Sequence, residues 1–224
     1  MTFSLVGRCA RTGMLGVVVT SSSPAVAARC AWTRARAGAV ATQNVTDPSL
    51  GPKVLDVIEL GRAAGEAVRD VVSAAPCAEY RQLAAVDAQG RTASYSGSRT
   101  LGRHASSGGT DCLAAGNLLA DVSVTGAMVR AFERRPLDHL ADRLLDALRA
   151  GQAAGGEEGS VHSCGLQVVG EVPWPVTDLR VDWHDDPLTE LARLWALWRP
   201  LEAEYVQRAL DPAAAPGYGV PGDE

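Results

Sequence analysis

The sequence predicts an α+β fold in which helices cover both faces of a double antiparallel sheet, giving an αββα sandwich of four layers. Strand-like stretches occur as neighbouring pairs, and helical stretches also follow one another in pairs. A doubly wound parallel fold would instead alternate one strand with one helix. The predicted strand pairs are residues 3–6 with 15–20, 83–87 with 91–96, and 163–169 with 176–182.

The first strand pair opens the chain. Residues 3–6 and 15–20 are apolar runs joined by a short link that contains Gly13, which is typical of a hairpin. Pro24 ends the second strand. The small apolar residues 38–43 then predict a third, buried strand.

Two helices follow this strand. Asp47-Pro48 begins a helix that Gly61 ends, and Val68 and Val71 mark one face of a second helix. We expect both helices to pack on one side of the sheet. The hairpin of residues 83–87 and 91–96 comes next.

Residues 97–111 are rich in Ser, Gly, Arg and Thr and predict a long loop, which ends at Asn117. A loop of this length in a compact domain is usually functional or mobile. The domain continues with two predicted helices over 122–133 and 137–150 and a loop over 155–162. It ends with the last strand pair and a helix capped by Asp185-Asp186-Pro187. We predict one domain over residues 1–208 and a disordered Pro- and Gly-rich tail over 209–224.

Composition excludes several classes of function. Of the 224 residues, 46 % are apolar and 21 % are charged, and the net charge of −5 does not favour a nucleic-acid partner. No apolar run is long enough to span a membrane, and the first residues lack a signal-peptide pattern. We therefore expect a cytoplasmic protein without a membrane partner, in which the five scattered cysteines are reduced.

No motif for a metal or a bound cofactor stands out. The four histidines have no His-Glu-x-x-His or comparable spacing, so we expect no metal and no cofactor. A Gly-x-Ser-x-Gly elbow and a phosphate-binding Gly-x-x-x-x-Gly-Lys loop do not occur either.

The start of the chain carries the strongest candidate for catalysis. A small residue at position 2 permits removal of Met1, which would leave Thr2 with a free α-amino group beside its own hydroxyl. An α-amino group titrates near about 7.7–8.0, so at neutral pH it can accept the hydroxyl proton during attack on a carbonyl. Many chains begin Met-Thr without any such consequence. Here the strand that starts at Phe3 would hold the terminus still.

Several blocks in order carry a resemblance to a known family. They are Met1 to Val6, Leu15 to Val19, Trp32 with Arg34, residues 38–43, 48–52 and 116–119, Ala153 to Gly156, and Asp178 to Asp182. Together, over Thr2 to about Trp198, they resemble the DUF1028 family, an uncharacterised bacterial and archaeal group. The resemblance implies the αββα sandwich of N-terminal nucleophile hydrolases, which cleave amide bonds with an N-terminal Thr, Ser or Cys. For this chain it implies Thr2 as the nucleophile and a small-molecule amide as the substrate.

The chain departs from the family pattern at two places. Ala115 replaces a frequent glutamine, and residues 157–162 replace a basic segment that contains glutamine. The proteasome branch of the superfamily also uses a lysine near the third strand. Lys53, the only lysine, does not lie there, so Arg34 or Arg36 would be the available cation.

These observations give a set of candidate site residues. Asn117 or Gln43, with a backbone N–H, would stabilise the oxyanion, and Arg34 would orient the nucleophile or bind a substrate carboxylate. We expect Thr2, Arg34, Gln43 and Asn117 to converge on one pocket. Ser21, Arg99 and His104 are candidates for substrate binding, although exposed loop arginines are also typical of a solvated surface.

Two further alternatives remain open at this point. One concerns activity: a protein that binds a small ligand or acts as a scaffold could keep the same fold without the reaction. The other concerns the last helix, whose apolar surface over Leu188 to Leu201 is wider than one face requires. A homodimer or larger homo-oligomer would bury the excess, or the tail would fold back over it.

Overall fold

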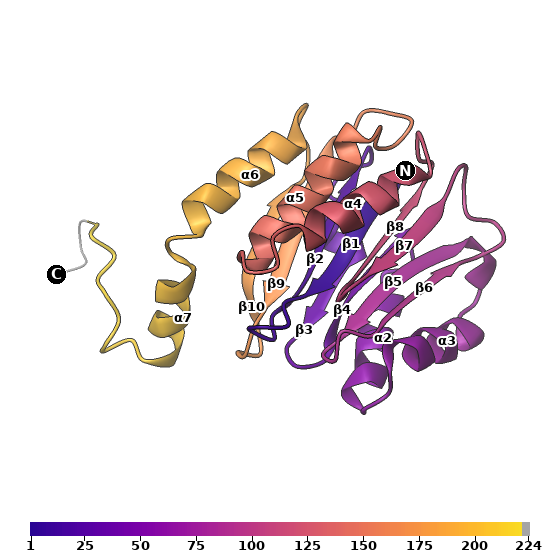
Figure 1. Cartoon of the computed structure of the whole chain (residues 1–224). Coiled ribbons are helices and arrows are strands. Elements are labelled where there is room, and N and C mark those ends of the chain that lie inside the picture. Colours follow the sequence, from indigo (N-terminus) through magenta and orange to yellow (C-terminus); the bar gives the residue numbers. More distant parts are fainter. Residues whose placement is uncertain (221–224) are drawn as a thin grey trace.

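The computed structural model describes residues 1–220 and confirms the predicted sandwich of four layers (Figure 1). Within these residues, ten strands form two sheets in which every pairing is antiparallel. The first sheet contains β1 (Thr2–Arg8), β2 (Leu15–Ser21), β7 (Ala105–Gly109), β8 (Cys112–Asn117), β9 (Ser163–Val169) and β10 (Pro175–Val181). The second contains β3 (Ala31–Arg34), β4 (Gly38–Asn44), β5 (Arg81–Asp87) and β6 (Thr92–Ser96).

The N-terminal strand β1 lies inside the first sheet, whose order is β10-β9-β2-β1-β8-β7. It pairs with β2 on one side, where Phe3 lies opposite Thr20, and with β8 on the other, where Thr2 lies opposite Asn117. Because both edges of β1 are hydrogen-bonded, the strand does not fray as most chain ends do. The first residues of the chain are therefore fixed in place.

Helices form the two outer layers (Figure 1). The face of the first sheet is covered by α4, α5 and α6, and that of the second by α2 and α3. The helices are α1 (Ala27–Cys30), α2 (Leu50–Glu59), α3 (Ala64–Ala74), α4 (Ser123–Glu133), α5 (Leu140–Ala153), α6 (Pro187–Trp198) and α7 (Glu202–Leu210), with a 3-10 turn at Ala78–Tyr80. The predicted cap of the last helix is present, because the Asp186 side chain accepts a hydrogen bond from the amide of Thr189.

The strand period of two divides the core into layers. Along β1, Phe3 and Leu5 face the α4–α5 layer, whereas Val6 faces the second sheet. The layer between the sheets is built largely from small side chains, which allow the sheets to pack closely. They include Ala39, Ala41, Ala84 and Ala115.

A glycine in β1 permits a close helix contact. A Cβ atom on Gly7 would lie 2.6 Å from Cζ of Phe132, a side chain of α4 that is fully buried. This distance is far below van der Waals contact, so any larger residue would push α4 away from the sheet.

The structure differs from the sequence prediction in the region 97–117. The expected long loop contains β7, and β8 follows it directly. Ser, Gly and Ala have low strand propensity, so these strands depend on tertiary pairing, which β8 finds along β1. The single predicted final helix is also divided into α6 and α7, because Pro200 follows α6 and cannot donate the backbone hydrogen bond that would continue it.

Residues 211–220 form no helix or strand and extend past α7. Arg208 of α7 donates hydrogen bonds to the carbonyl groups of Pro216 and Gly217, so this stretch folds back on α7. Across residues 1–220, no helix combines the length and the apolar character needed to cross a bilayer.

Candidate active site

Polar side chains gather at one end of the layer between the sheets. Thr2 and Ser4 lie on the same face of β1 as Val6, which belongs to the core between the sheets. Gln43, near the end of β4, and Gln82, near the start of β5, lie opposite each other in register. This end of the sandwich therefore carries hydroxyl and amide groups where the rest of the layer is apolar.

A chain of hydrogen bonds joins these groups across the two sheets. The Ser4 hydroxyl donates to Oε1 of Gln43 at 2.7 Å, and Nε2 of Gln43 donates to Oε1 of Gln82 at 2.8 Å. The side-chain amide of Asn117 donates to the same Gln82 oxygen at 3.1 Å. Nε2 of Gln82 in turn donates to Ser96 and to the Gly116 carbonyl.

This network fixes the site before any ligand binds. Ser4, Gln43, Gln82 and Asn117 are all fully buried, and the hydrogen bonds set the orientation of each amide group. Oδ1 of Asn117 has no hydrogen-bond partner among the described residues. A buried polar atom without a partner is unusual and often marks a functional position.

The Thr2 side chain lies at the centre of a second group of hydroxyls. Its Oγ1 donates to the carbonyl oxygen of Met1 at 2.5 Å and lies 3.4 Å from Oγ of Ser21. Ser21 donates to the same Met1 carbonyl and has Ser23 as a further hydroxyl partner at 2.8 Å. The Met1–Thr2 peptide carbonyl is therefore bound by two hydroxyl groups.

A buried carboxyl group completes this end of the sandwich. Glu157 is only 5 % exposed, and neither of its carboxylate oxygens makes a hydrogen bond of normal geometry within residues 1–220. Burial raises the pKa of Glu157 to about 7, while the N-terminal ammonium of Met1 and the nearby Ser22 amide act in the opposite direction. The Glu157 backbone is held by a bridge to Leu119, just beyond Asn117.

The structure brings four of the predicted residues to this end of the sandwich. Thr2 pairs with Asn117 across β1 and β8, where partner Cα atoms lie about 4.5–5.5 Å apart. Ser21 contacts the Thr2 hydroxyl, and Gln43 reaches Asn117 through Gln82.

Arg34 does not join this group, so the predicted convergence of four residues is not found. It pairs with Gly38 at the opposite end of β4 from Gln43, a separation of about 17 Å at about 3.4 Å per residue. Its guanidinium group instead forms ion pairs with Asp56 at 2.7 Å and Glu59 at 2.9 Å. The sequence suggested Arg34 because it lies near the third strand, but the register of β3 and β4 directs it to α2.

Arg99 and His104 lie in the exposed segment between β6 and β7. Arg99 donates to the hydroxyl of Tyr80 at 2.7 Å, and Nδ1 of His104 lies 3.1 Å from the carbonyl of Gly102. This segment passes close to the site, because the Leu118 amide, next to Asn117, donates to its backbone. No contact between either predicted side chain and Thr2 is found in the described part of the chain.

Gln82 and Glu157 were missed at the level of sequence. A polar residue at the start of a strand of small apolar side chains was an available indication for Gln82. No feature of the sequence indicated Glu157, because an acidic residue in a glycine-containing loop is normally solvated. Its burial depends on contacts with residues far away in the sequence.

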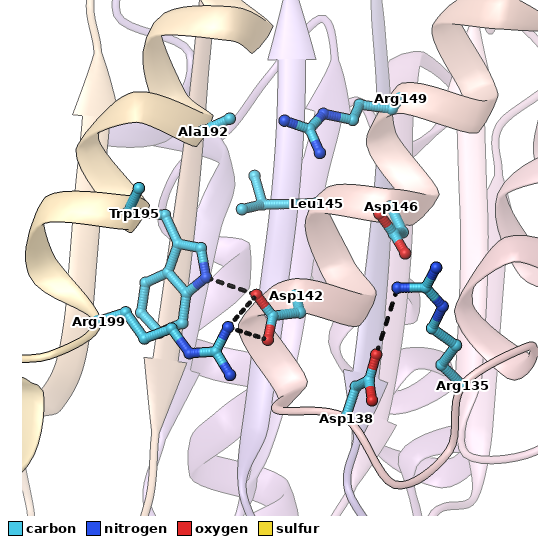
Figure 2. A pocket seen from close by; sticks show the side chains of 10 residues that line it. Arg135, Asp138, Asp142, Leu145, Asp146, Arg149, Ala192, Trp195 and Arg199 are labelled. Atoms are coloured by element: carbon cyan, nitrogen blue, oxygen red, sulfur yellow. Dashed lines mark hydrogen bonds and ion pairs between the residues drawn. The ribbon is translucent and has the colours of Figure 1, made fainter.

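A separate hollow lies on the outer helix layer, between α5 and α6 (Figure 2). It encloses about 410 Å³, and Figure 2 shows that four of its six charged side chains already contact one another in pairs. Asp142 accepts from Trp195 at 2.8 Å and pairs with Arg199 at 3.1 Å, and Arg135 pairs with Asp138 at 3.6 Å. The first sheet separates this hollow from Thr2. Within residues 1–220, no group of three or more His, Cys, Asp or Glu side chains is arranged to hold a metal.

Comparison with known proteins places this architecture in a family. The profile described as "Family of unknown function (DUF1028)" matches residues 2–191. The crystal structure of protein SPO2555 from Silicibacter pomeroyi, described as a DUF1028 protein, superposes with a TM-score of 0.84 at 30 % identity, covering 92 % of this chain and 90 % of that one. Anbu (ancestral beta-subunit) from Yersinia bercovieri has a TM-score of 0.37 and 10 % identity, with 92 % and 97 % covered. No curated protein matches the chain in sequence. From the profile match and the relative from Silicibacter pomeroyi, the chain belongs to the DUF1028 family.

Proposed function

We propose that this protein is a cytoplasmic amidohydrolase that cleaves a small amide with Thr2 as its N-terminal nucleophile, after removal of Met1. The observation that carries the proposal is the position of the Thr2 hydroxyl. It lies 2.5 Å from an amide carbonyl oxygen, that of Met1, at the polar end of the layer between the sheets. A hydroxyl in this position can attack a carbonyl carbon once a base is available.

Removal of Met1 supplies that base. While Met1 is present, the nitrogen of Thr2 belongs to a peptide bond and cannot accept a proton. In the trimmed chain the same nitrogen is an amine, separated from the hydroxyl oxygen only by Cα and Cβ of Thr2. It accepts the hydroxyl proton as Oγ1 attacks, and then donates a proton to the nitrogen that leaves.

Neighbouring groups stabilise the developing charge. Ser21 donates to the Met1 carbonyl, so we assign its hydroxyl to the carbonyl oxygen of the substrate. The Asn117 amide, on the strand that pairs with Thr2, has a second N–H available for the oxyanion. Gln43 is engaged by Ser4 and Gln82, so we give it a positioning role. Water then attacks the ester on Thr2 and releases the acid.

The experiment compares variants of Thr2 on a panel of small amides, with the N-terminus of each preparation verified by intact mass. We expect Thr2→Ala to lower turnover by about 10⁴-fold or more, because the covalent nucleophile is lost. Thr2→Ser keeps the oxygen and should retain part of the activity. The matched control is Thr12→Ala, since Thr12 lies in an exposed turn.

Two results would contradict the proposal. Turnover that is unchanged in Thr2→Ala would assign the reaction to other residues. Quantitative retention of Met1 in the native-start protein would leave the nitrogen of Thr2 acylated. That second result favours the non-catalytic candidate, a small-ligand-binding or scaffold protein, and the binding of the Met1 carbonyl by Thr2 and Ser21 is the observation that supports it.

A further inference from the structure

Met1 occupies the site in the way that an acyl group of a substrate would. Its carbonyl oxygen is bound by the hydroxyls of Thr2 and Ser21. Its side chain lies against Gly159, where Cε is 3.0 Å from the position that a Cβ atom would take. Its α-ammonium group lies near Glu157 and favours the ionised form of that carboxyl. Each part of this first residue thus has a defined neighbour.

The carboxyl of Glu157 is buried beside a cation, the ammonium of Met1. It is about nineteen-twentieths buried, and neither oxygen makes a hydrogen bond of normal geometry with the described residues, the Ser22 amide being the one donor that acts on it. A buried carboxylate normally has a positive partner or several donors. The Met1 ammonium is the positive charge that lies near it. Removal of Met1 takes this ammonium away and leaves the amine of Thr2 further along the chain, which the proposed reaction uses in its uncharged form. The mature site would then hold a buried acidic group with a place for a cation beside it.

The adjacent acidic residue shows that this arrangement is particular to Glu157. Glu158 is about half exposed at its side chain and pairs with Arg103 at 3.1 Å. It therefore has both solvent and a cation of its own. Glu157 and Glu158 have the same type of side chain but differ in burial and in ion pairing. Glu158 is therefore a matched control.

We infer that Glu157 recognises a cationic group of the substrate, and that the substrate class is an amide whose acyl part carries an ammonium group on the carbon next to the carbonyl, an α-aminoacyl amide. The reaction in this inference rests on the proposed function, whereas the recognition can be tested without it. In Met1, one carbon separates the bound carbonyl from the ammonium, and the inferred substrate has the same spacing. An acyl group on Oγ1 of Thr2 occupies nearly the place of one on its nitrogen, because only Cα and Cβ separate these two atoms.

The reaction on such an amide balances with water as the only co-reactant. Oγ1 of Thr2 forms an ester bond to the acyl carbon as the C–N bond breaks, and the hydroxyl proton passes through the Thr2 amine to the departing ammonia. Water then adds to the ester, which releases the amino acid and restores the hydroxyl. Glu157 holds the substrate ammonium throughout and exchanges no proton in these steps.

The first arm of the test measures binding without turnover. It uses Thr2→Ala protein lacking Met1, titrated calorimetrically with L-methioninamide and with 4-(methylthio)butanamide, which has the same side chain but no ammonium. We expect L-methioninamide to bind about 10- to 100-fold tighter, the range for a hydrogen bond to a buried charged group. Adding Glu157→Gln should remove this preference, whereas adding Glu158→Gln should preserve it. Glu157→Asp keeps the charge and should retain part of the preference.

Several results would overturn the recognition. They are equal affinity for the two amides, no binding of either, or a preference that survives Glu157→Gln. If Glu157→Gln weakened the binding of both amides equally, the role of Glu157 would be merely structural. Binding of the uncharged amide by this variant also verifies that its site is folded.

The second arm measures ammonia release from both amides by the Thr2-containing protein, and it separates the two proposals. If neither amide is hydrolysed while the Glu157-dependent preference in binding stands, the proposed reaction fails and the recognition stands. If both are hydrolysed with equal kcat/KM, the reaction stands and the recognition fails. A kcat/KM that favours L-methioninamide and loses this advantage in Glu157→Gln supports both.

Discussion

Replacing Glu157 by glutamine should stabilise the protein at neutral and alkaline pH. Burial raises the pKa of this carboxyl from 4.5 to about 7, so the folded state favours the protonated form. The contribution of this carboxyl to wild-type stability is therefore fully present below about pH 4.5 and is lost as pH rises through about 7. At 1.36 kcal/mol per pKa unit, the full interval corresponds to roughly 3 kcal/mol, an upper limit because water or side-chain movement relieves part of the cost.

The assay is thermal unfolding at about pH 4 and about pH 8, because glutamine resembles the protonated acid and carries no such penalty. We expect Glu157→Gln to gain about 2–3 kcal/mol at the higher pH, or roughly 5–10 °C in Tm, and almost nothing at the lower pH. Glu158→Gln removes an exposed ion pair and should change stability by less than about 1 kcal/mol. A Glu157→Gln protein that gains nothing at about pH 8, or gains equally at both pH values, would refute the reasoning.

Three other predictions concern parts of the chain outside this carboxyl. Arg34→Ala should change turnover little and stability by less than about 1 kcal/mol, because its two acidic partners are well exposed; a large loss in a steady-state assay would return Arg34 to the site. Gln82→Leu should cost about 3 kcal/mol or more in urea unfolding, since it removes four hydrogen bonds, three of them fully buried, and an unchanged midpoint would contradict the network. We also propose self-association through the apolar side chains left exposed on α6 and in the link to α7, among them Leu197 and Leu201, at 58 % and 39 % exposure. Sedimentation should show a homodimer or larger oligomer that Leu197→Glu weakens, and a purely monomeric wild type at micromolar concentration would reject it.

The fold was largely predictable because its main strands and helices carry strong periodic patterns. Paired apolar runs located β1 with β2 and β9 with β10, and leucines at helical spacing located α5 and α6. The strands β7 and β8 were not predictable, because their Ser, Gly and Ala residues form a sheet only when β1 offers them a partner. Local propensity decides the first group and tertiary pairing the second.

The candidate site was predictable to a smaller degree. Thr2 and Ser21 flank the two strands of the predicted first hairpin, so the sequence pattern indicates that they lie close together. Asn117 was suggested by the family resemblance instead, because the strand that places it opposite Thr2 was not predictable. Arg34 was placed by its distance from a strand along the chain, and this distance did not determine at which end of the strand it lies. Glu157 depends on the bridge between a loop and Leu119, a contact that no local pattern encodes.

The position of β1 between two hydrogen-bonded neighbours has a practical consequence for expressing this protein. Because Thr2 is held at the end of a central strand and is only 5 % exposed, any peptide added before it must leave through the space that Met1 now fills. An N-terminal purification tag would therefore keep the nitrogen of Thr2 in a peptide bond and obstruct this end of the sandwich. Under the proposed function, a preparation made in this way would be inactive even if the native-start protein were active. Affinity handles belong after α7, which lies across the molecule from the first residue (Figure 1).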